Sequence, residues 1–246
     1  MEERKTIYLC LAHMSETGEE QKYVKEAFDT NWVVPLGPNV NGFEDDLKAF
    51  VSKNSDGSEL SREVVALSAG TAAVHLGLLA SGVGPGDEVC VQSFTFCASS
   101  HPITYLGATP VFIDSEPDSW NMDPELLEKA IIDRKEKTGK YPKAIVPVAL
   151  YGMPYDCDKI MAISEKYGIP VVEDAAEGCG SRWKGQVLGT FGKFGVLSFN
   201  GNKMITTSGG GALICQDAES KNNVMWYATQ ARDAYPYYQH TAIGYN

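Results

Sequence analysis

The segment at residues 64–82, VVALSAGTAAVHLGLLASG, carries a strand signal and a helix signal with no linker between them. Residues 64–70 form a β-branched run that ends in small residues, which predicts a strand. Residues 71–82 are mostly apolar and end at a glycine, which predicts a helix that stops there. A strand that leads directly into a helix is the repeating unit of sheets built from parallel strands.

The same alternation continues on both sides of this segment. Further strands are predicted at residues 84–93, 110–114, 144–150, 170–176, 197–199 and 211–214. Further helices are predicted at residues 19–30, 43–51, 98–107, 123–134, 158–168 and 222–234. We therefore expect an α/β fold in which a mostly parallel central sheet has helices on both faces.

The composition excludes several classes of protein. The 246 residues are 43% apolar and 22% charged, as in ordinary globular proteins, and their net charge is −11. Such an acidic surface disfavours nucleic acid and anionic membranes as partners, because phosphate groups are repelled. No run approaches the ~20 apolar residues of a membrane span, and the short apolar run near the N-terminus lacks the pattern of a signal peptide. We expect a cytoplasmic protein.

The cysteines and histidines give no sign of a metal site or of disulfides. The six cysteines are scattered, and no two of them form a CxxC pair. We expect them to be reduced residues of the core or of a pocket. The four histidines show no metal-ligand spacing, so no metal is predicted. The cysteines are Cys10, Cys90, Cys97, Cys157, Cys179 and Cys215.

Ligands bind to sheets of this kind outside the carboxyl ends of the strands. The first such end carries Gly70 and Thr71, at a strand-to-helix turn. Unpaired backbone N–H groups at a helix start favour a phosphate or a carboxylate. An ordinary helix cap at Thr71 explains the same residues equally well. The turn matches neither a Walker loop nor a dinucleotide-binding fingerprint.

The side chains at two further strand ends each allow a structural interpretation and a ligand-binding interpretation. Asp174 follows an apolar strand, either as the cap of a following helix or as a carboxylate paired with a cation. Phe94 and Phe96 stand at strand spacing, which is typical of core residues. One of these two rings could instead stack on a planar ligand.

The segment at residues 197–214, LSFNGNKMITTSGGGALI, contains one lysine, Lys203, between Ser198 and three glycines. A lone lysine in a loop is usually exposed. Together with the other strand ends, however, Lys203 completes a set that one ligand would satisfy. That ligand needs an anion for the helix start and Ser198, a flat ring for an aromatic side chain, a basic ring nitrogen for Asp174 and an aldehyde for the lysine. Pyridoxal 5′-phosphate has all four groups.

Motifs along nearly the whole chain also resemble one known family. They include NWVVPLG, ALSAGTAAVHLGL, GVGPGDEV, SFTFCAS, GATPVFID, LYGMPYDCDKI, PVVEDAAEGCGS, SFNGNK and HTAIGYN. On these motifs the chain resembles the sugar aminotransferases of the DegT/DnrJ type, a branch of the fold-type-I pyridoxal-phosphate enzymes. NGNKMITTSGGGALI and ATQARD look closest to the branch that makes UDP-4-amino-4,6-dideoxy-N-acetylglucosamine, the bacillosamine precursor.

The resemblance implies a role for each matching residue. Lys203 matches the lysine that binds the cofactor aldehyde, Asp174 the acid at the pyridine nitrogen, and Phe96 the flat residue on the cofactor ring. The other matches concern the cofactor phosphate (Gly70, Thr71, Ala72 and Ser198), the phosphate of the neighbouring subunit (Asn246) and the substrate side (Asn31, Trp32, Val33 and Val34).

Two departures from the family pattern stand out. Ala149 replaces a histidine before LYG, which we interpret as variation within a strand. The chain also stops at GYN, where family members continue into a C-terminal domain. We therefore expect residues 1–246 to form the large, cofactor-binding domain, with a substrate-side segment at about residues 1–50. Most of the small C-terminal domain, which full activity requires, is expected to be absent from this chain.

The resemblance implies a transamination in two halves, in a homodimer with shared active sites. L-Glutamate would supply the amino group, and the acceptor would be a nucleotide-linked 4-keto-6-deoxy sugar, a UDP-linked N-acetylhexosamine, for glycan or polysaccharide precursors. Three alternatives stay open. They are a sugar dehydratase, in which a histidine replaces the lysine, an amino-acid-processing enzyme of the same fold, and a catalytically silent regulatory or assembly module.

Overall fold

The computed structural model describes residues 13–246, and Cys10 lies outside the described residues. The described helices are α1 (Glu19–Asp29), α2 (Pro38–Ser52), α3 (Gly70–Ala80), α4 (His101–Tyr105), α5 (Pro124–Thr138), α6 (Cys157–Tyr167) and α7 (Ala218–Ala228), with 3-10 turns η1 (Cys97–Ser99) and η2 (Leu150–Gly152). The strands are β1 (Glu63–Leu67), β2 (Glu88–Gln92), β3 (Thr109–Ile113), β4 (Ala144–Val146), β5 (Val172–Asp174), β6 (Arg182–Trp183), β7 (Gln186–Val187), β8 (Phe194–Ser198) and β9 (Gly211–Cys215).

The central sheet consists of a four-stranded part, β1-β9-β8-β5, and a three-stranded part, β3-β2-β4. Backbone hydrogen bonds join the two parts: Ile145 N donates to Pro170 O at 3.0 Å, and Asp174 N donates to Pro147 O at 2.9 Å. Within this sheet β9 runs antiparallel to β1 and β8, and the other strand pairs are parallel. The expectation of a mostly parallel sheet is confirmed.

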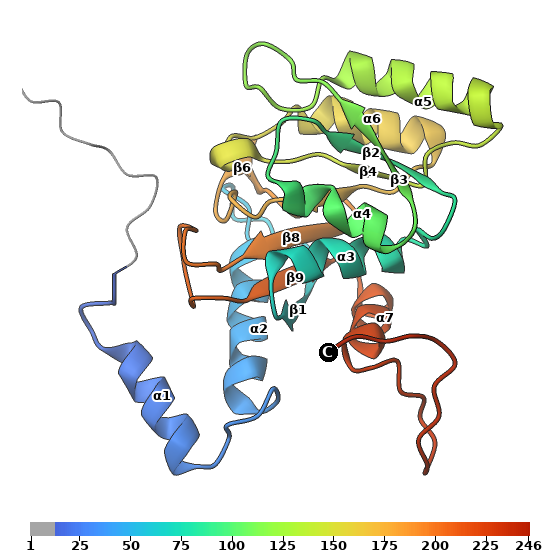
Figure 1. Cartoon of the computed structure of the whole chain (residues 1–246). Helices are drawn as coiled ribbons and strands as arrows, with labels where there is room; N and C mark the ends of the chain where they lie inside the picture. Colours follow the sequence, from blue (N-terminus) through green and yellow to red (C-terminus); the bar gives the residue numbers. More distant parts are fainter. Residues whose placement is uncertain (1–12) are drawn as a thin grey trace, which may run out of the picture.

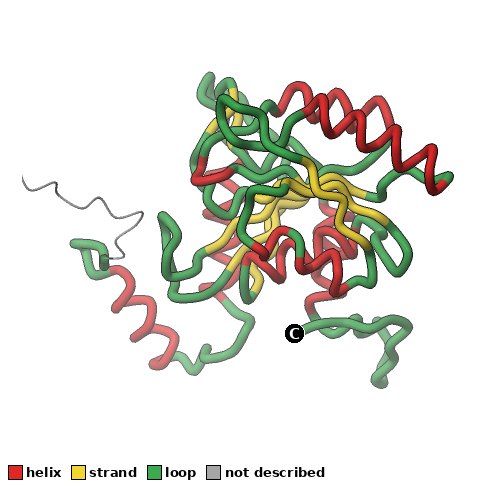
Figure 2. Tube along the Cα trace, turned by 45° about the horizontal axis from the view of Figure 1, so that its top comes forward, coloured by secondary structure: helices red, strands yellow, loops and turns green. Residues whose placement is uncertain are grey.

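Helices cover both faces of the sheet (Figure 1). One core cluster contains side chains of α2, α5 and α6, and the other contains side chains of α3, α4 and α7. Helix α1 contributes no buried residue and lies apart from the sheet in both views (Figures 1 and 2). No helix within residues 13–246 combines the length and the apolarity that crossing a membrane requires.

Several element boundaries differ from the sequence-based prediction, among them those of α2 and α7. Helix α2 begins at Pro38, inside the predicted loop, because proline suits a first helical turn whose N–H groups have no partner. Helix α7 begins at Ala218, four residues before the predicted start, and Asp217 caps it by accepting a hydrogen bond from Ser220 N at 2.8 Å. It ends at Ala228, since left-handed backbone at Gln230 and Ala231 cannot continue a helix. The small β6–β7 hairpin was not predicted.

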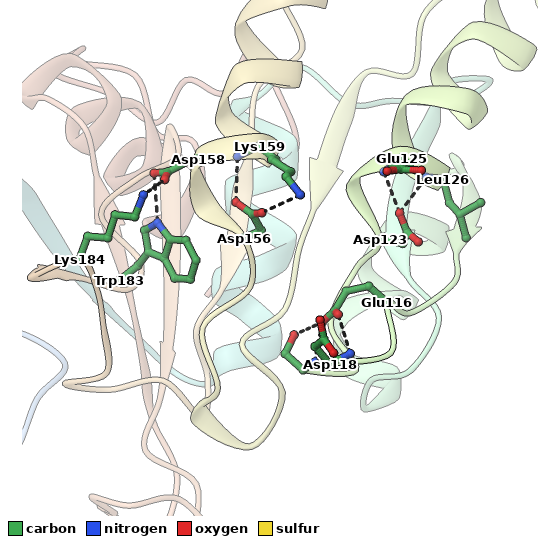
Figure 3. A network of polar contacts seen from close by, with 11 residues as sticks. Glu116, Asp118, Asp123, Glu125, Leu126, Asp156, Asp158, Lys159, Trp183 and Lys184 are labelled. Atoms are coloured by element: carbon green, nitrogen blue, oxygen red, sulfur yellow. Dashed lines mark hydrogen bonds and ion pairs between the residues drawn. The ribbon is translucent and has the colours of Figure 1, made fainter.

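Short polar contacts fix the ends of the helices on the α5–α6 face (Figure 3). Asp123 caps α5 by accepting hydrogen bonds from the backbone N–H groups of Glu125 and Leu126. Asp156 caps α6 in the same way, through Lys159 N. Such caps each stabilise a helix by about 1 kcal/mol. Both capping residues lie in the loops that precede the helices.

Glu173, in β5, is a carboxylate buried in the sheet, with an exposed fraction of 1%. Its oxygens accept hydrogen bonds from the backbone N–H groups of Gly189 (2.9 Å), Phe191 (2.6 Å) and Gly192 (2.6 Å). Burial raises the pKa of Glu173, and the N–H donors oppose that rise. These bonds fold residues 189–192 into the turn that leads into β8.

Replacing Glu173 should therefore destabilise the whole fold. We expect Glu173→Ala to lower the free energy of unfolding by about 3 kcal/mol or more, because three N–H groups, two of them in buried hydrogen bonds, lose their acceptor at about 1–3 kcal/mol each. Glu173→Gln keeps one acceptor oxygen and should cost less. The measurement is the urea midpoint at unchanged m-value. The exposed Glu165→Gln is the control, and an equal midpoint for it and for Glu173→Ala would contradict this role.

Candidate active site

A cavity of about 570 Å³ lies where β1, β2, β4, β5 and β8 end. Its walls therefore come from loops far apart in the sequence, as the carboxyl-edge rule for parallel sheets predicts. Of the predicted site residues, six line this cavity: Gly70, Thr71, Phe96, Asp174, Ser198 and Lys203.

The first wall is the N-terminus of α3. The helix starts at Gly70 with Ala69 in the capping position, and no side chain caps it, so Thr71 is not the N-cap. A Cβ atom on Gly70 would lie 2.8 Å from Ser198 Cβ, which shows how closely the helix start approaches the end of β8. The first N–H groups of α3 and the Ser198 hydroxyl thus face one space, and this arrangement suits a phosphate.

Asp174 forms the floor of the cavity and has an exposed fraction of only 6%. Ser99 Oγ donates to its Oδ2 at 2.6 Å, and Ala176 N donates to its Oδ1 at 3.1 Å. Burial raises the pKa of Asp174, whereas these two hydrogen bonds and the charge of Lys203 lower it. No helix follows β5 directly, so the helix-cap interpretation of Asp174 is wrong.

Lys203 reaches the cavity from the loop between β8 and β9. The turn around it is closed by a hydrogen bond from Lys203 N to Asn200 O at 2.9 Å. Its Nζ lies 3.5 Å from Oε1 of Glu177, and both side chains are largely buried. Lys203 is therefore a cation inside a pocket, and the interpretation as an exposed surface lysine is wrong.

The two phenylalanines are not core residues. Phe94 and Phe96 are both exposed, Phe96 to 74%, and both line the cavity. An exposed aromatic ring on a cavity wall presents a flat apolar face to whatever enters. This placement favours the interpretation in which one ring stacks on a planar ligand.

Among the cavity residues that the sequence analysis missed are Glu177 and Tyr151. Glu177 holds Lys203 through Oε1 and accepts a hydrogen bond from Tyr151 N through Oε2 at 2.6 Å. Tyr151 follows β4, lines the cavity and has left-handed backbone with φ of 50°. The available signal was their position: Glu177 stands three residues after Asp174, and Tyr151 stands at another strand end.

The remaining predicted residues lie outside the cavity of a single chain. Ala72 belongs to the first turn of α3 but does not line the cavity. The side chains of Trp32, Val33 and Val34, like their neighbour Asn31, are exposed between α1 and α2. The chain end is tied to α7, since Tyr245 N donates to Tyr227 O at 2.8 Å and Gln230 N donates to Tyr245 O at 3.0 Å; Asn246 beyond it is exposed.

The donor groups of the cavity fit pyridoxal 5′-phosphate. The uncapped helix start and Ser198 suit its phosphate, the buried Asp174 suits its ring nitrogen, and the Lys203 amine suits its aldehyde. Metal-ligating side chains are not gathered here, because residues 13–246 contain no group of three or more His, Cys, Asp or Glu that could hold an ion.

Several known proteins are similar to this chain. EpsN of Bacillus subtilis, whose name describes a pyridoxal phosphate-dependent aminotransferase, is 49% identical over 98% of this chain and 60% of its own length. GDP-perosamine synthase of Escherichia coli O157:H7 is 36% identical over 97% of this chain and 62% of its own length. UDP-2-acetamido-2-deoxy-3-oxo-D-glucuronate aminotransferase of Pseudomonas aeruginosa is 38% identical over 86% of this chain and 54% of its own length. The chain thus spans less than two thirds of these relatives.

Solved structures agree with these relatives. An aminotransferase of the DegT, DnrJ, EryC1 and StrS group from Brucella abortus matches with a TM-score of 0.80 and 32% identity, over 95% of this chain and 63% of its own. Spr1654 of Streptococcus pneumoniae, in a PLP form, matches with a TM-score of 0.79 and 27% identity, over 98% of this chain and 62% of its own. The family model for these enzymes matches residues 14–246. The chain belongs to the DegT/DnrJ/EryC1/StrS aminotransferase family.

Proposed function

We propose that the protein transfers an amino group from L-glutamate to a nucleotide-linked keto sugar, with pyridoxal 5′-phosphate as its cofactor. The observation that carries the proposal is the meeting of Lys203, Asp174 and the uncapped start of α3 in one cavity. When bound, the cofactor supplies an aldehyde that takes up the amino group and a ring that accepts electrons. Residues 1–246 would be the cofactor-binding large domain of a cytoplasmic enzyme.

Each cavity residue has a distinct task in this proposal. The N–H groups at Gly70 and Thr71, with the Ser198 hydroxyl, bind the phosphate, and a ring of the Phe94–Phe96 pair covers the cofactor face. Asp174 holds a proton on the ring nitrogen, because a buried carboxylate stabilises a positive charge beside it. The Lys203 amine would remove a proton from the donor Cα as general base and would deliver it to the former aldehyde carbon of the cofactor as general acid.

The proposed acceptor is a 4-keto-6-deoxy sugar, and a UDP-linked N-acetylhexosamine is the substrate that we favour. The names of the relatives support a nucleotide sugar, since they include a GDP-perosamine synthase and an aminotransferase for a UDP-linked 3-oxo sugar. They also show that the nucleotide varies among relatives, and the keto position that a name gives is position 3. The resemblance of residues 200–214 to the bacillosamine branch is what favours UDP and the 4-position.

One alternative within the same fold is disfavoured by a single residue. A dehydratase of this type would carry a histidine where Lys203 stands in the cavity. An amino-acid-processing enzyme would accept a keto acid in place of a keto sugar. Comparing 4-keto sugar nucleotides with keto acids as acceptors, in the full chain, distinguishes these two substrate classes.

Lys203 should be the residue that binds the cofactor covalently. We expect Lys203→Ala to abolish transamination, because no other lysine lines the described cavity. Borohydride reduction of the loaded protein, followed by peptide mapping, should find the adduct on Lys203. Lys193→Ala, at the opposite end of β8, should leave activity unchanged. An adduct on another lysine would contradict the assignment.

Asp174→Asn should leave the fold intact and remove most of the activity. The amide is nearly isosteric, so we expect the free energy of unfolding to change by less than about 2 kcal/mol. The transamination rate should fall by about 100-fold or more, because a neutral amide cannot hold the ring nitrogen charged. Asp156→Asn, which keeps a helix cap, is the control and should retain full activity. Near-normal transamination rates for Asp174→Asn would contradict this role at the ring nitrogen and would indicate that Asp174 is only structural.

We further propose a homodimer in which each active site contains residues of both chains. Asn246 and the apolar residues Trp32, Val33 and Val34 are exposed in a single chain, where apolar side chains are unfavourable in water. A closed two-fold interface would give two equivalent sites. Lys203 and Asp174 would come from one chain, and Asn246 would come from its partner.

Mixing inactive variants tests this sharing. In a heterodimer of Lys203→Ala and Asn246→Ala chains, one site carries both lesions and the other carries none. Activity should recover to roughly a quarter of wild type for random pairing. Lys203→Ala mixed with Asp174→Asn is the control and should show no recovery, because both residues line the cavity of one chain. No recovery in the first mixture despite proven subunit exchange would contradict shared sites.

A further inference from the structure

Two hydroxyl groups beside Asp174, those of Thr95 and of Ser99 in η1, also belong to residues that line the cavity. Thr95 Oγ1 and Ser99 Oγ are 2.8 Å apart, and Ser99 Oγ lies 2.6 Å from Asp174 Oδ2. Ser99 is buried, with an exposed fraction of 1%. The three side chains thus form a continuous hydrogen-bonded chain, from the loop after β2 to the end of β5. No role in the proposed reaction has yet been given to either hydroxyl.

The direction of these hydrogen bonds follows from the proton count. An ionised carboxylate only accepts hydrogen bonds, so Ser99 must donate its one hydroxyl proton to Asp174. Ser99 then has no second proton to give, and Thr95 must donate to Ser99. The chain is therefore polarised toward Asp174. A hydrogen bond to a charged acceptor is about twice as strong as a neutral one, and its 2.6 Å length fits that class.

Asp174 needs such support, because it is a buried acid with mixed neighbours. Burial raises the pKa of Asp174, and the Ser99 hydrogen bond opposes that rise more than any other contact does. Ala176 N–H and the charge of Lys203 oppose it further, whereas the charge of Glu177 adds to it. Lys203 and Glu177 are thus the charged groups that act most strongly on Asp174. Without Ser99, the carboxyl group would have one hydrogen-bond donor fewer and more freedom to rotate.

We propose that Ser99, oriented by Thr95, is a positioning residue that holds the Asp174 carboxylate toward the ring nitrogen of the cofactor. Ser99 fixes Oδ2 and Ala176 N fixes Oδ1, so the plane of the carboxylate is set by two anchors on opposite oxygens. The inference rests on the proposed pairing of Asp174 with the ring nitrogen. It adds that η1, a turn from a different part of the sequence, controls that pairing.

The test compares two ligands that differ only at the ring nitrogen. Pyridoxal 5′-phosphate and its 1-deaza analogue, which has C–H in place of that nitrogen, share the phosphate and the aldehyde. Their contacts with α3 and Lys203 therefore cancel in the ratio of the two Kd values. For the full chain, we expect Ser99→Ala to weaken binding of pyridoxal 5′-phosphate by about tenfold, the size of one charge-assisted hydrogen bond. Binding of the 1-deaza analogue should change little.

Three further variants make the result specific. Ser99→Thr keeps the hydroxyl and should retain the wild-type ratio of Kd values. Thr95→Val removes the donor to Ser99 at nearly constant volume and should shift the ratio in the same direction as Ser99→Ala, by less. Ser100→Ala, in the same turn, is the matched control: its hydroxyl bonds to Cys97 O at 3.2 Å and does not contact Asp174. It should leave both Kd values unchanged.

Asp174→Asn separates failure of this inference from failure of the proposed function. If Asp174→Asn leaves the ratio of Kd values at its wild-type level, Asp174 does not pair with the ring nitrogen, and both proposals fall. If Asp174→Asn changes the ratio but Ser99→Ala and Thr95→Val do not, only the positioning role is overturned. Equal weakening of both ligands by Ser99→Ala would also overturn it, because a purely structural defect does not distinguish nitrogen from carbon.

Discussion

The structure depends on two adjacent carboxylates buried at the end of β5. Successive side chains of a strand point to opposite faces, so Glu173 and Asp174 face different sides of the sheet. Glu173 accepts hydrogen bonds from the backbone N–H groups of Gly189, Phe191 and Gly192 and so fixes the approach to β8. Asp174 faces the cavity, into which β8 delivers Ser198 and the following loop delivers Lys203. Of these two neighbouring residues, Glu173 therefore stabilises the fold and Asp174 belongs to the candidate active site.

Much of this arrangement could be predicted from the sequence. Alternating strands and helices indicate the parallel sheet, and the rule that ligands bind at carboxyl ends selects Thr71, Asp174 and Lys203 without a structure. The contact of Glu177 with Lys203 and Tyr151 could not be found in this way, because it depends on the path of an irregular turn. The end of α7 was also misplaced, since nothing in the residue types of Gln230 and Ala231 demands left-handed backbone.

The N-terminal segment shows what a sequence pattern leaves undetermined. Hydrophobic periodicity correctly predicted α1, yet none of its residues is buried in a single chain. The helix lies apart from the sheet (Figure 2). Local sequence therefore determines the helix, whereas the sheet domain of the single chain does not cover it. The apolar loop at residues 31–36 is likewise exposed in a single chain. Sequence patterns report which face is apolar, but they do not report what covers it.

The antiparallel direction of β9 has a consequence for how such a protein can change. Because β8 and β9 are neighbours and run in opposite directions, the loop that carries Lys203 closes locally, between the paired residues Ser198 and Gly211. The cavity walls that follow β1, β2 and β4 come from connections that contain a helix, so their rearrangement would disturb that helix. The lysine loop is instead the end of a hairpin, so its length and sequence can vary while the ladder beneath it persists. Evolution can thus alter the reactive group of this fold without having to rebuild the sheet.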